Sequence, residues 1–273
     1  MKLAFIGGGN MAYALIIGLK NKKITMSNIV VVEHDVSKWA QLEQLGVHVS
    51  ADLSTVADCS AIVLAIKPQQ LSALAKNLTP FLSVKSTFQP LIISIAAGIR
   101  LADLSRWLGN YQTIVRAMPN TPAQIQAGIT GLYAMPSISK KHIALADLIL
   151  KAAGSTIWLD SEEKLDAVTA ISGSGPAYVF YLIEALQAAA QNLGLNETQA
   201  KQLSIATFKG ASLLAHASAT SIETLRMQVT SKGGTTEQGI LSLEHSQVKQ
   251  AVVLAAQKAC ERAKTLGQEL GKD

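Results

Sequence analysis

Four apolar runs in the first half of the chain constrain its fold most. They are "KLAFIG" (Lys2 to Gly7), "NIVVVE" (Asn28 to Glu33), "AIVLAIKP" (Ala61 to Pro68) and "PLIISIAAG" (Pro90 to Gly98). Each is short and lacks an alternating polar face, so each predicts a strand that is buried on both sides. The segments "MAYALIIGLK" and "VSKWAQLEQLG" between them have helical spacing. Strands of this kind belong in a parallel sheet that helices cover on both faces.

Three further segments continue the strand pattern: "QTIVRAMP" (residues 112–119), "GITGLYAM" (128–135) and "STIWLD" (155–160). Together the seven runs predict an α/β Rossmann domain over residues 1–160, with a doubly wound, mostly parallel sheet.

Residues 161–273 contain no strand-like run and predict an all-α domain. Pro176 suits the first turn of a long helix, Asn196 and Gln199 form a capping-box pattern for the next, and Ser246 is the expected cap of the last. The helices are rich in alanine and have broad apolar faces. Such faces indicate burial against a partner subunit, so we expect this half to be a dimerisation domain.

The composition excludes several classes of protein. Only 16% of the 273 residues are charged, and the net charge of +5 comes from scattered Lys and Arg residues, whereas a nucleic-acid partner favours clusters. Cys59 and Cys260 lie too far apart to suggest a disulfide framework, which fits a cytoplasmic protein. The apolar N-terminus is broken by glycines and Asn10, so we expect neither a signal peptide nor a membrane segment.

A dinucleotide-binding pattern follows the first predicted strand. Gly7, Gly9 and Ala12 have the G-x-G-x-x-A spacing, and Glu33 ends the second strand 21 residues after Ala12. The glycines permit a tight turn and a close approach of the backbone to a pyrophosphate, and the acidic residue suits the adenosine ribose. No phosphate-binding loop of the G-x-x-x-x-G-K-[ST] type occurs in the sequence.

The sequence offers few residues for other chemistry. The five histidines show no ligand spacing, so no metal site is expected, and "SGSGP" does not fit the G-x-S-x-G nucleophile motif. Hydride transfer to an activated carbon requires little else of the protein, since the cofactor supplies the difficult step.

Five blocks in order carry a resemblance to a known family. They are "IGGGNMA" (residues 6–12), "AIKPQ" (65–69), "RAMPNTPA" (116–123), "SGSGPAYVF" (172–180) and "SKGGTT" (231–236). Over essentially its whole length the chain resembles pyrroline-5-carboxylate reductase. The resemblance implies reduction of 1-pyrroline-5-carboxylate to L-proline by NADPH or NADH, the last step of proline biosynthesis. It also implies a chain that assembles as a dimer or as a ring of dimers.

The same resemblance implies a substrate site in the loop "SKGGTT". Backbone N–H groups of Gly233, Gly234 and Thr235 would receive the substrate carboxylate, and the Thr236 hydroxyl would bond to the imine nitrogen as the catalytic group. Physically, this is a helix N-terminus that meets an anion. The family's commonest loop has proline where this chain has Lys232.

The cofactor site implied by the motif and the resemblance has twelve residues: Gly7, Gly8, Gly9, Asn10, Met11, Glu33, His34, Ala65, Lys67, Pro68, Ala97 and Asn120. Glu33 favours NADH, because a carboxylate accepts hydrogen bonds from a ribose hydroxyl and repels a 2′-phosphate. His34 and Lys38 are cations or potential cations that oppose this preference. We expect both cofactors to work, with kcat/KM values within roughly tenfold of each other.

Two other functions remain open at this point. A dehydrogenase of the hydroxy-acid type on the same two-domain plan would need a catalytic lysine in the helix after Asp160, and Lys164 is available but precedes the "SGSG" block. A non-catalytic protein that senses a dinucleotide is the other alternative.

Overall fold

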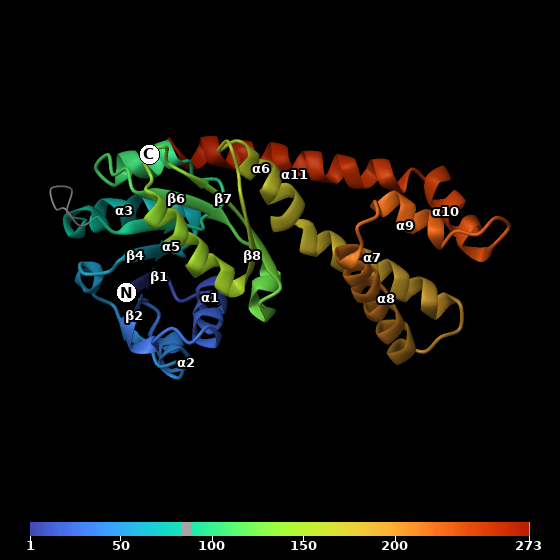
Figure 1. Ribbon diagram of the computed structural model, residues 1–273, viewed down its shortest axis with the longest axis horizontal. Coiled ribbons are helices and arrows are strands. Elements are labelled where there is room, and N and C mark those ends of the chain that lie inside the picture. The colour runs from blue at the N-terminus through green and yellow to red at the C-terminus, as the bar shows by residue number, and fades with distance from the viewer. Residues whose placement is uncertain (83–88, 273) are drawn as a thin grey trace. The chain divides into compact units, whose positions relative to one another are not determined.

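The computed structural model describes residues 1–82 and 89–272 and divides the chain into two compact units. The first contains Met1–Ser174 together with Ala259–Asp273, and the second contains Gly175–Lys258. Figure 1 shows the sheet of the first unit and the helices of the second. Within the described residues, no helix combines the length and the apolar character needed to cross a membrane.

An eight-stranded sheet forms the centre of the first unit, in the order β3-β2-β1-β4-β5-β6-β7-β8. Its strands are β1 (Leu3–Ile6), β2 (Ile29–Val32), β3 (His48–Ser50), β4 (Ala61–Leu64), β5 (Leu91–Ser94), β6 (Ile114–Met118), β7 (Gly128–Ala134) and β8 (Gly154–Trp158). Only the pairing of β6 with β7 is antiparallel among these strands. The predicted Rossmann fold with a mostly parallel sheet is therefore confirmed, and all seven predicted strands are present.

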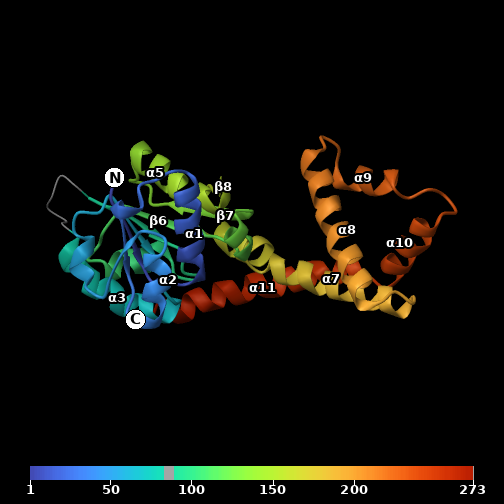
Figure 2. The same cartoon turned by 90° about the horizontal axis from the view of Figure 1, so that it is seen from below.

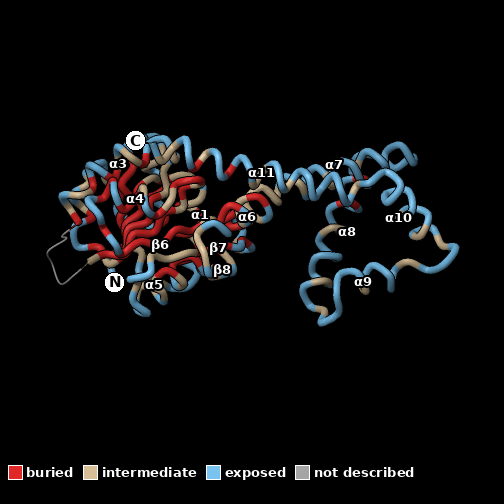
Figure 3. The backbone as a smooth tube through the Cα atoms, turned by 90° about the horizontal axis from the view of Figure 1, so that it is seen from above, coloured by how far each residue is buried: buried red, intermediate tan, exposed pale blue. Residues whose placement is uncertain are grey.

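Helices cover both faces of this sheet, as the two-sided apolar strands require. One core contains side chains from α1 (Asn10–Asn21), α2 (Trp39–Glu43) and α5 (Lys140–Leu150). The core on the other face contains side chains from α3 (Leu71–Leu78) and α4 (Leu101–Trp107). Figure 3 shows the buried backbone concentrated in these strands and the helices around them.

A buried group of charges links β6 to the helix that leaves the sheet. This helix, α6 (Lys164–Val168), continues into a π-helical turn, Thr169–Gly173. Arg116 Nη1 lies 2.9 Å from Glu162 Oε1, and Arg100 Nη2 lies 2.7 Å from Asp166 Oδ2. Arg116 and Asp166 are both buried. Burial lowers the pKa of Arg116, although the Glu162 and Asp166 carboxylates oppose that shift.

The second unit consists of helices. They are α7 (Gly175–Asn192), α8 (Glu197–Ala217), α9 (Ile222–Gln228), α10 (Thr235–His245) and the first part of α11 (Val248–Leu270), and Figure 2 shows them from a second side. The predicted capping box is present, because Asn196 and Gln199 bond reciprocally to each other's backbone N–H groups. The expectation for Ser246 was wrong. Ser246 closes α10, and Gln247 then takes a left-handed conformation (φ 53°) before α11 begins.

The compact units divide at Ser174, whereas the sequence suggested a boundary at residue 160. The last residues of α11 also belong to the first unit. A Cβ atom on Gly267 would lie only 2.6 Å from the Gly98 carbonyl oxygen, so the end of α11 packs backbone to backbone against the loop after β5. Arg106 strengthens this contact with a 2.7 Å hydrogen bond to the Gly271 carbonyl.

The buried charges give a stability prediction. Asp166→Ala should destabilise the protein by about 3–5 kcal/mol, because it removes the close carboxylate partner of Arg100 and the second carboxylate near the buried Arg116, 3.8 Å away. Asp160→Ala is the control. It removes an exposed ion pair with Lys164 and should leave stability close to wild type. Urea unfolding of all three proteins at one protein concentration measures the difference, and equal losses in the two variants would contradict the prediction.

Candidate functional site

The turn between β1 and α1 builds the first part of the candidate cofactor site. Gly7 has a φ of 97°, and a Cβ atom there would lie 2.6 Å from the Ala65 carbonyl oxygen. Its N–H donates to the Val32 carbonyl, while the N–H of Ala65 donates to Ile6. Because β1 lies between β2 and β4, this turn stands where the strand order reverses. Open α/β sheets bind their ligands at that point.

Glu33 lies beside this turn at the end of β2 and is held in place by several donors. The Gly8 N–H donates to one carboxylate oxygen at 2.8 Å, and the Asp35 N–H donates to the other at 2.9 Å. Lys38 Nζ lies 3.3 Å from the first of these oxygens. Burial acts to raise the pKa of Glu33, but these bonds outweigh it and lower the pKa below the usual value of glutamate. Glu33 therefore presents a fixed negative charge.

The start of α1 offers donors for an anion. Its N-cap residue is Gly9, which has no side chain to bond to the first turn, and that turn contains no acidic residue. The first N–H groups of a helix have no partner within the helix. Those of Asn10 and Met11 are therefore suited to the phosphates of a dinucleotide.

The remaining predicted cofactor residues lie at the carboxyl ends of the strands or just beyond them. His34 is exposed directly after Glu33, and Ala65, Lys67 and Pro68 follow β4. Ala97 follows β5, next to the glycine that contacts the end of α11. Asn120 follows β6, and its side-chain oxygen accepts the N–H of Ile129 at 2.9 Å. This hydrogen bond fixes the start of β7, which is a structural role that the sequence did not indicate.

Sequence reasoning also missed how thoroughly Lys38 is engaged. Its ammonium group contacts Glu33 and also Asp35, at 3.5 Å. Trp39 anchors the same segment, because its indole N–H donates to the Glu33 carbonyl at 2.9 Å. The i, i+5 spacing of Glu33 and Lys38 fits no regular helical pair, so no sequence pattern indicated this contact.

The candidate substrate loop lies in the second unit, between α9 and α10. The Gly233 N–H donates to Glu237 Oε2 at 2.7 Å, and the Gly234 N–H donates to the Ser231 carbonyl at 3.0 Å. Two of the three predicted carboxylate donors therefore already have partners within the chain. Thr235 begins α10, where first-turn N–H groups lack helical partners. Thr236 is exposed, and its hydroxyl makes no hydrogen bond among the described residues.

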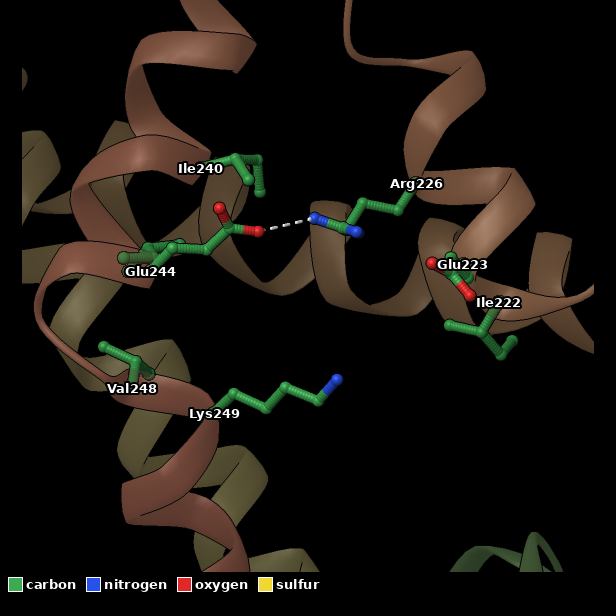
Figure 4. A pocket seen from close by; sticks show the side chains of 8 residues that line it. Ile222, Glu223, Arg226, Ile240, Glu244, Val248 and Lys249 are labelled. Carbon is green, nitrogen blue, oxygen red and sulfur yellow. Dashed lines mark hydrogen bonds and ion pairs between the residues drawn. The ribbon is translucent and has the colours of Figure 1, made fainter.

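Helix α10 also forms one wall of a groove of about 540 Å³ within the second unit. The groove is lined by Ile222, Glu223, Arg226, Ile240, Leu243, Glu244, Val248 and Lys249, from α9, α10 and α11. Figure 4 shows Arg226 and Glu244 reaching toward each other across it, and their charged atoms lie 3.2 Å apart. Apolar side chains thus share the groove with an exposed ion pair.

Comparison with known proteins decides the family. Residues 162–266 match the model for pyrroline-5-carboxylate reductase dimerisation, and residues 2–98 match the model for coenzyme F420-dependent NADP oxidoreductases. The pyrroline-5-carboxylate reductase of Pseudomonas aeruginosa is 40% identical over 273 residues, which cover 98% of both chains. The enzyme of Haemophilus influenzae is 35% identical over 97% of both chains. The chain belongs to the pyrroline-5-carboxylate reductase family.

Solved structures agree with this assignment. The pyrroline-5-carboxylate reductase of Coxiella burnetii has a TM-score of 0.91 at 39% identity, covering 97% of this chain and 98% of that one. A reductase from Plasmodium falciparum with NADP bound has a TM-score of 0.85 at 30% identity, covering 98% of both chains. The chain is thus an NAD(P)H-dependent oxidoreductase with a Rossmann domain and a helical dimerisation domain.

The fixed charge of Glu33 gives a prediction for this reductase. Glu33→Ala should improve the ratio of NADPH to NADH affinity by a few-fold, because one like-charge contact near solvent is worth about 1 kcal/mol, or about fivefold. Glu43→Ala, which removes an exposed carboxylate from α2, serves as the control. Titration of both cofactors by nicotinamide fluorescence gives the dissociation constants. An unchanged ratio in Glu33→Ala would place Glu33 away from the 2′ position.

Proposed function

We propose that this chain reduces 1-pyrroline-5-carboxylate to L-proline with NADH or NADPH, the last step of proline biosynthesis. Membership of the reductase family over the whole chain is the observation that carries this proposal. The expected kcat/KM values for the two cofactors lie within roughly tenfold of each other, since the ammonium group of Lys38 lies 3.3 Å from the Glu33 carboxylate and partly offsets its charge.

The residues of the first unit fit a dinucleotide. A Cβ atom at Gly7 would collide with the Ala65 carbonyl oxygen, so the turn requires glycine, whereas the space beside Gly9 is open. The first turn of α1 supplies N–H groups for the phosphates, and Glu33 faces the ribose of the adenosine. The bound nicotinamide supplies a hydride. His34, Lys67, Pro68, Ala97 and Asn120 complete the proposed site at the ends of β2, β4, β5 and β6.

The residues of the second unit orient the imine. Gly233 and Gly234 shape the turn, and the free N–H groups of Thr235 and Thr236 receive the substrate carboxylate at the start of α10. The Thr236 hydroxyl accepts a hydrogen bond from the protonated ring nitrogen and so aligns the C=N bond. The ring carbon gains the hydride, the π electrons pass to nitrogen, and nitrogen keeps its proton as the amine forms. Because the protonated imine is already electrophilic, orientation supplies most of what the protein must add.

A hydroxy-acid dehydrogenase finds less support. It would need Lys164 as its catalytic group, but this lysine lies exposed in an ion pair, 2.7 Å from Asp160. A protein that only senses a dinucleotide would bind the cofactor and leave the imine unchanged. A steady-state assay with 1-pyrroline-5-carboxylate separates the three functions.

The family's dimerisation domain shows that the chain self-associates. We propose that it forms a dimer or a ring of dimers, and that a second copy of the chain occupies the groove beside α10. We also propose that the protein is cytoplasmic and has no nucleic-acid partner. The exposed apolar side chains of the second unit support this, among them Val252, Val253 and Leu254 of α11. No residue of α7, α9 or α10, all within the described residues, is buried in the single chain.

Loss of the Thr236 hydroxyl tests the substrate site. Thr236→Ala should lower kcat/KM for the imine by about tenfold or more, the scale of a hydrogen bond to a charged group. Its affinity for NADH should stay at the wild-type value. Thr236→Ser keeps the hydroxyl and should retain most of the activity. An unchanged kcat/KM in Thr236→Ala would remove this residue from the mechanism.

Self-association gives a separate prediction. Leu254→Lys should weaken the dimer by at least about tenfold, since burial of one leucine side chain contributes about 1.5–3 kcal/mol. Leu148→Lys changes an exposed leucine of α5 in the first unit and should leave the dimer intact. Sedimentation velocity over a range of protein concentrations measures both. A folded, active wild-type monomer at micromolar concentration would contradict the proposed assembly.

A further inference from the structure

The loop before α10 contains a tight turn that depends on a glycine. The Gly234 N–H donates to the Ser231 carbonyl at 3.0 Å, and Gly233 has a φ of 74°. A bond from the first residue to the fourth, with a positive φ at the third, is the pattern of a type II turn. Lys232 then occupies the second position, where a residue with negative φ is required and proline is favoured. The N–H of Lys232 makes no hydrogen bond among the described residues.

Only one side chain ties this turn to the helix that follows, within the described residues. Glu237, in the first turn of α10, accepts the Gly233 N–H at 2.7 Å. Its side chain is half-buried, whereas Gly233 is exposed. The acceptor is a carboxylate, so the bond is of the stronger, charge-assisted kind. A negative charge in the first turn also interacts favourably with the helix dipole.

Two flexible residues make this bond important. Glycine, which occupies position 233, has more backbone freedom than any other residue type. Lys232 lacks the pyrrolidine ring with which a proline would fix its φ. The N–H groups of Thr235 and Thr236 follow directly, and their direction depends on how the turn enters the helix. We propose that Glu237 is a positioning residue of the substrate loop. It fixes Gly233 and thereby holds the N–H groups of Thr235 and Thr236 ready for the carboxylate of the imine.

This inference rests on the proposed function. It gives Glu237 a role different from that of the Thr235 and Thr236 N–H groups, which would bind the substrate. The Glu237 carboxylate bonds on the Gly233 side of the turn, whereas the free N–H groups belong to the first turn of α10. The substrate anion therefore need not displace Glu237. A preorganised loop binds its ligand more tightly because less conformational entropy is lost on binding.

Steady-state kinetics of the full-length enzyme test the role of Glu237. Glu237→Ala should raise KM for 1-pyrroline-5-carboxylate by about fivefold, the scale of one hydrogen bond at a half-exposed position. KM for NADH should stay within about twofold of wild type, because the cofactor residues lie in the first unit. Glu237→Gln keeps an acceptor oxygen and should recover most of the loss. Glu197→Ala, which removes an acidic residue from the first turn of α8, is the matched control.

A second substitution should rescue the KM for the imine. It would not do so if Glu237 acted only as a cap that stabilises α10. Lys232→Pro should fit the second position of the turn and restrict the unbound loop. In the Glu237→Ala background it should return KM for the imine to within about twofold of wild type. The proline acts only on the turn, so rescue would tie the kinetic defect to loop order.

Several results would overturn the proposal. A lower imine KM in Glu237→Ala would show that its carboxylate competes with the substrate. An unchanged KM for the imine would show that Glu237 acts only as a helix cap. Equal increases in the KM values for imine and cofactor would indicate a general structural defect, as would the absence of rescue by Lys232→Pro. A wild-type enzyme without activity on the imine would instead refute the proposed function, so the two failures are distinguishable.

Discussion

The turn at Gly7 is the constraint on which the cofactor half of the molecule depends. Its φ is positive, and a Cβ atom there would lie 2.6 Å from the Ala65 carbonyl oxygen, so the position admits no side chain. That single turn joins β1 to α1, and the Gly7 N–H donates to the Val32 carbonyl at the end of β2. It also brings the Gly8 N–H to Glu33. The fixed carboxylate is thus a consequence of the same backbone geometry that leaves room for a pyrophosphate.

The two units bury their apolar residues in different ways. The first encloses its strands between two layers of helices, and its cores are complete within one chain. The helices of the second unit leave large apolar side chains such as Phe180, Leu213 and Leu254 exposed. An amphipathic helix is stable in a protein only when its apolar face is covered. The match to the family's dimerisation domain supports a second subunit as the cover that we propose for these faces.

The sheet was predictable because its signal is local. Runs such as "IVVV" in β2 and "AIVL" in β4 are buried on both faces, so every position reports the same environment. The short strand β3, "HVS", carried no such signal, because three residues are too few to show a pattern. Ser246 was misassigned for a related reason. A serine between two helices suits either the end of one or the start of the other, and the left-handed Gln247 decided between them.

The candidate site could be proposed from the sequence where backbone geometry determines it, but not where side chains that are distant in the sequence meet. Glycine spacing indicated the cofactor turn, and the resemblance to the family implied the substrate loop. The proposed work of each is done by backbone N–H groups. Glu33 contacts Lys38, and Glu237 accepts the Gly233 N–H. Both contacts depend on side-chain rotamers and on the angle at which the chain enters a helix, which residue spacing does not predict. A reaction whose substrate is activated by its own positive charge needs directed donors more than titrating side chains. In such an enzyme, the sequence motifs most specific to its function lie in loops that contain few chemically reactive residues.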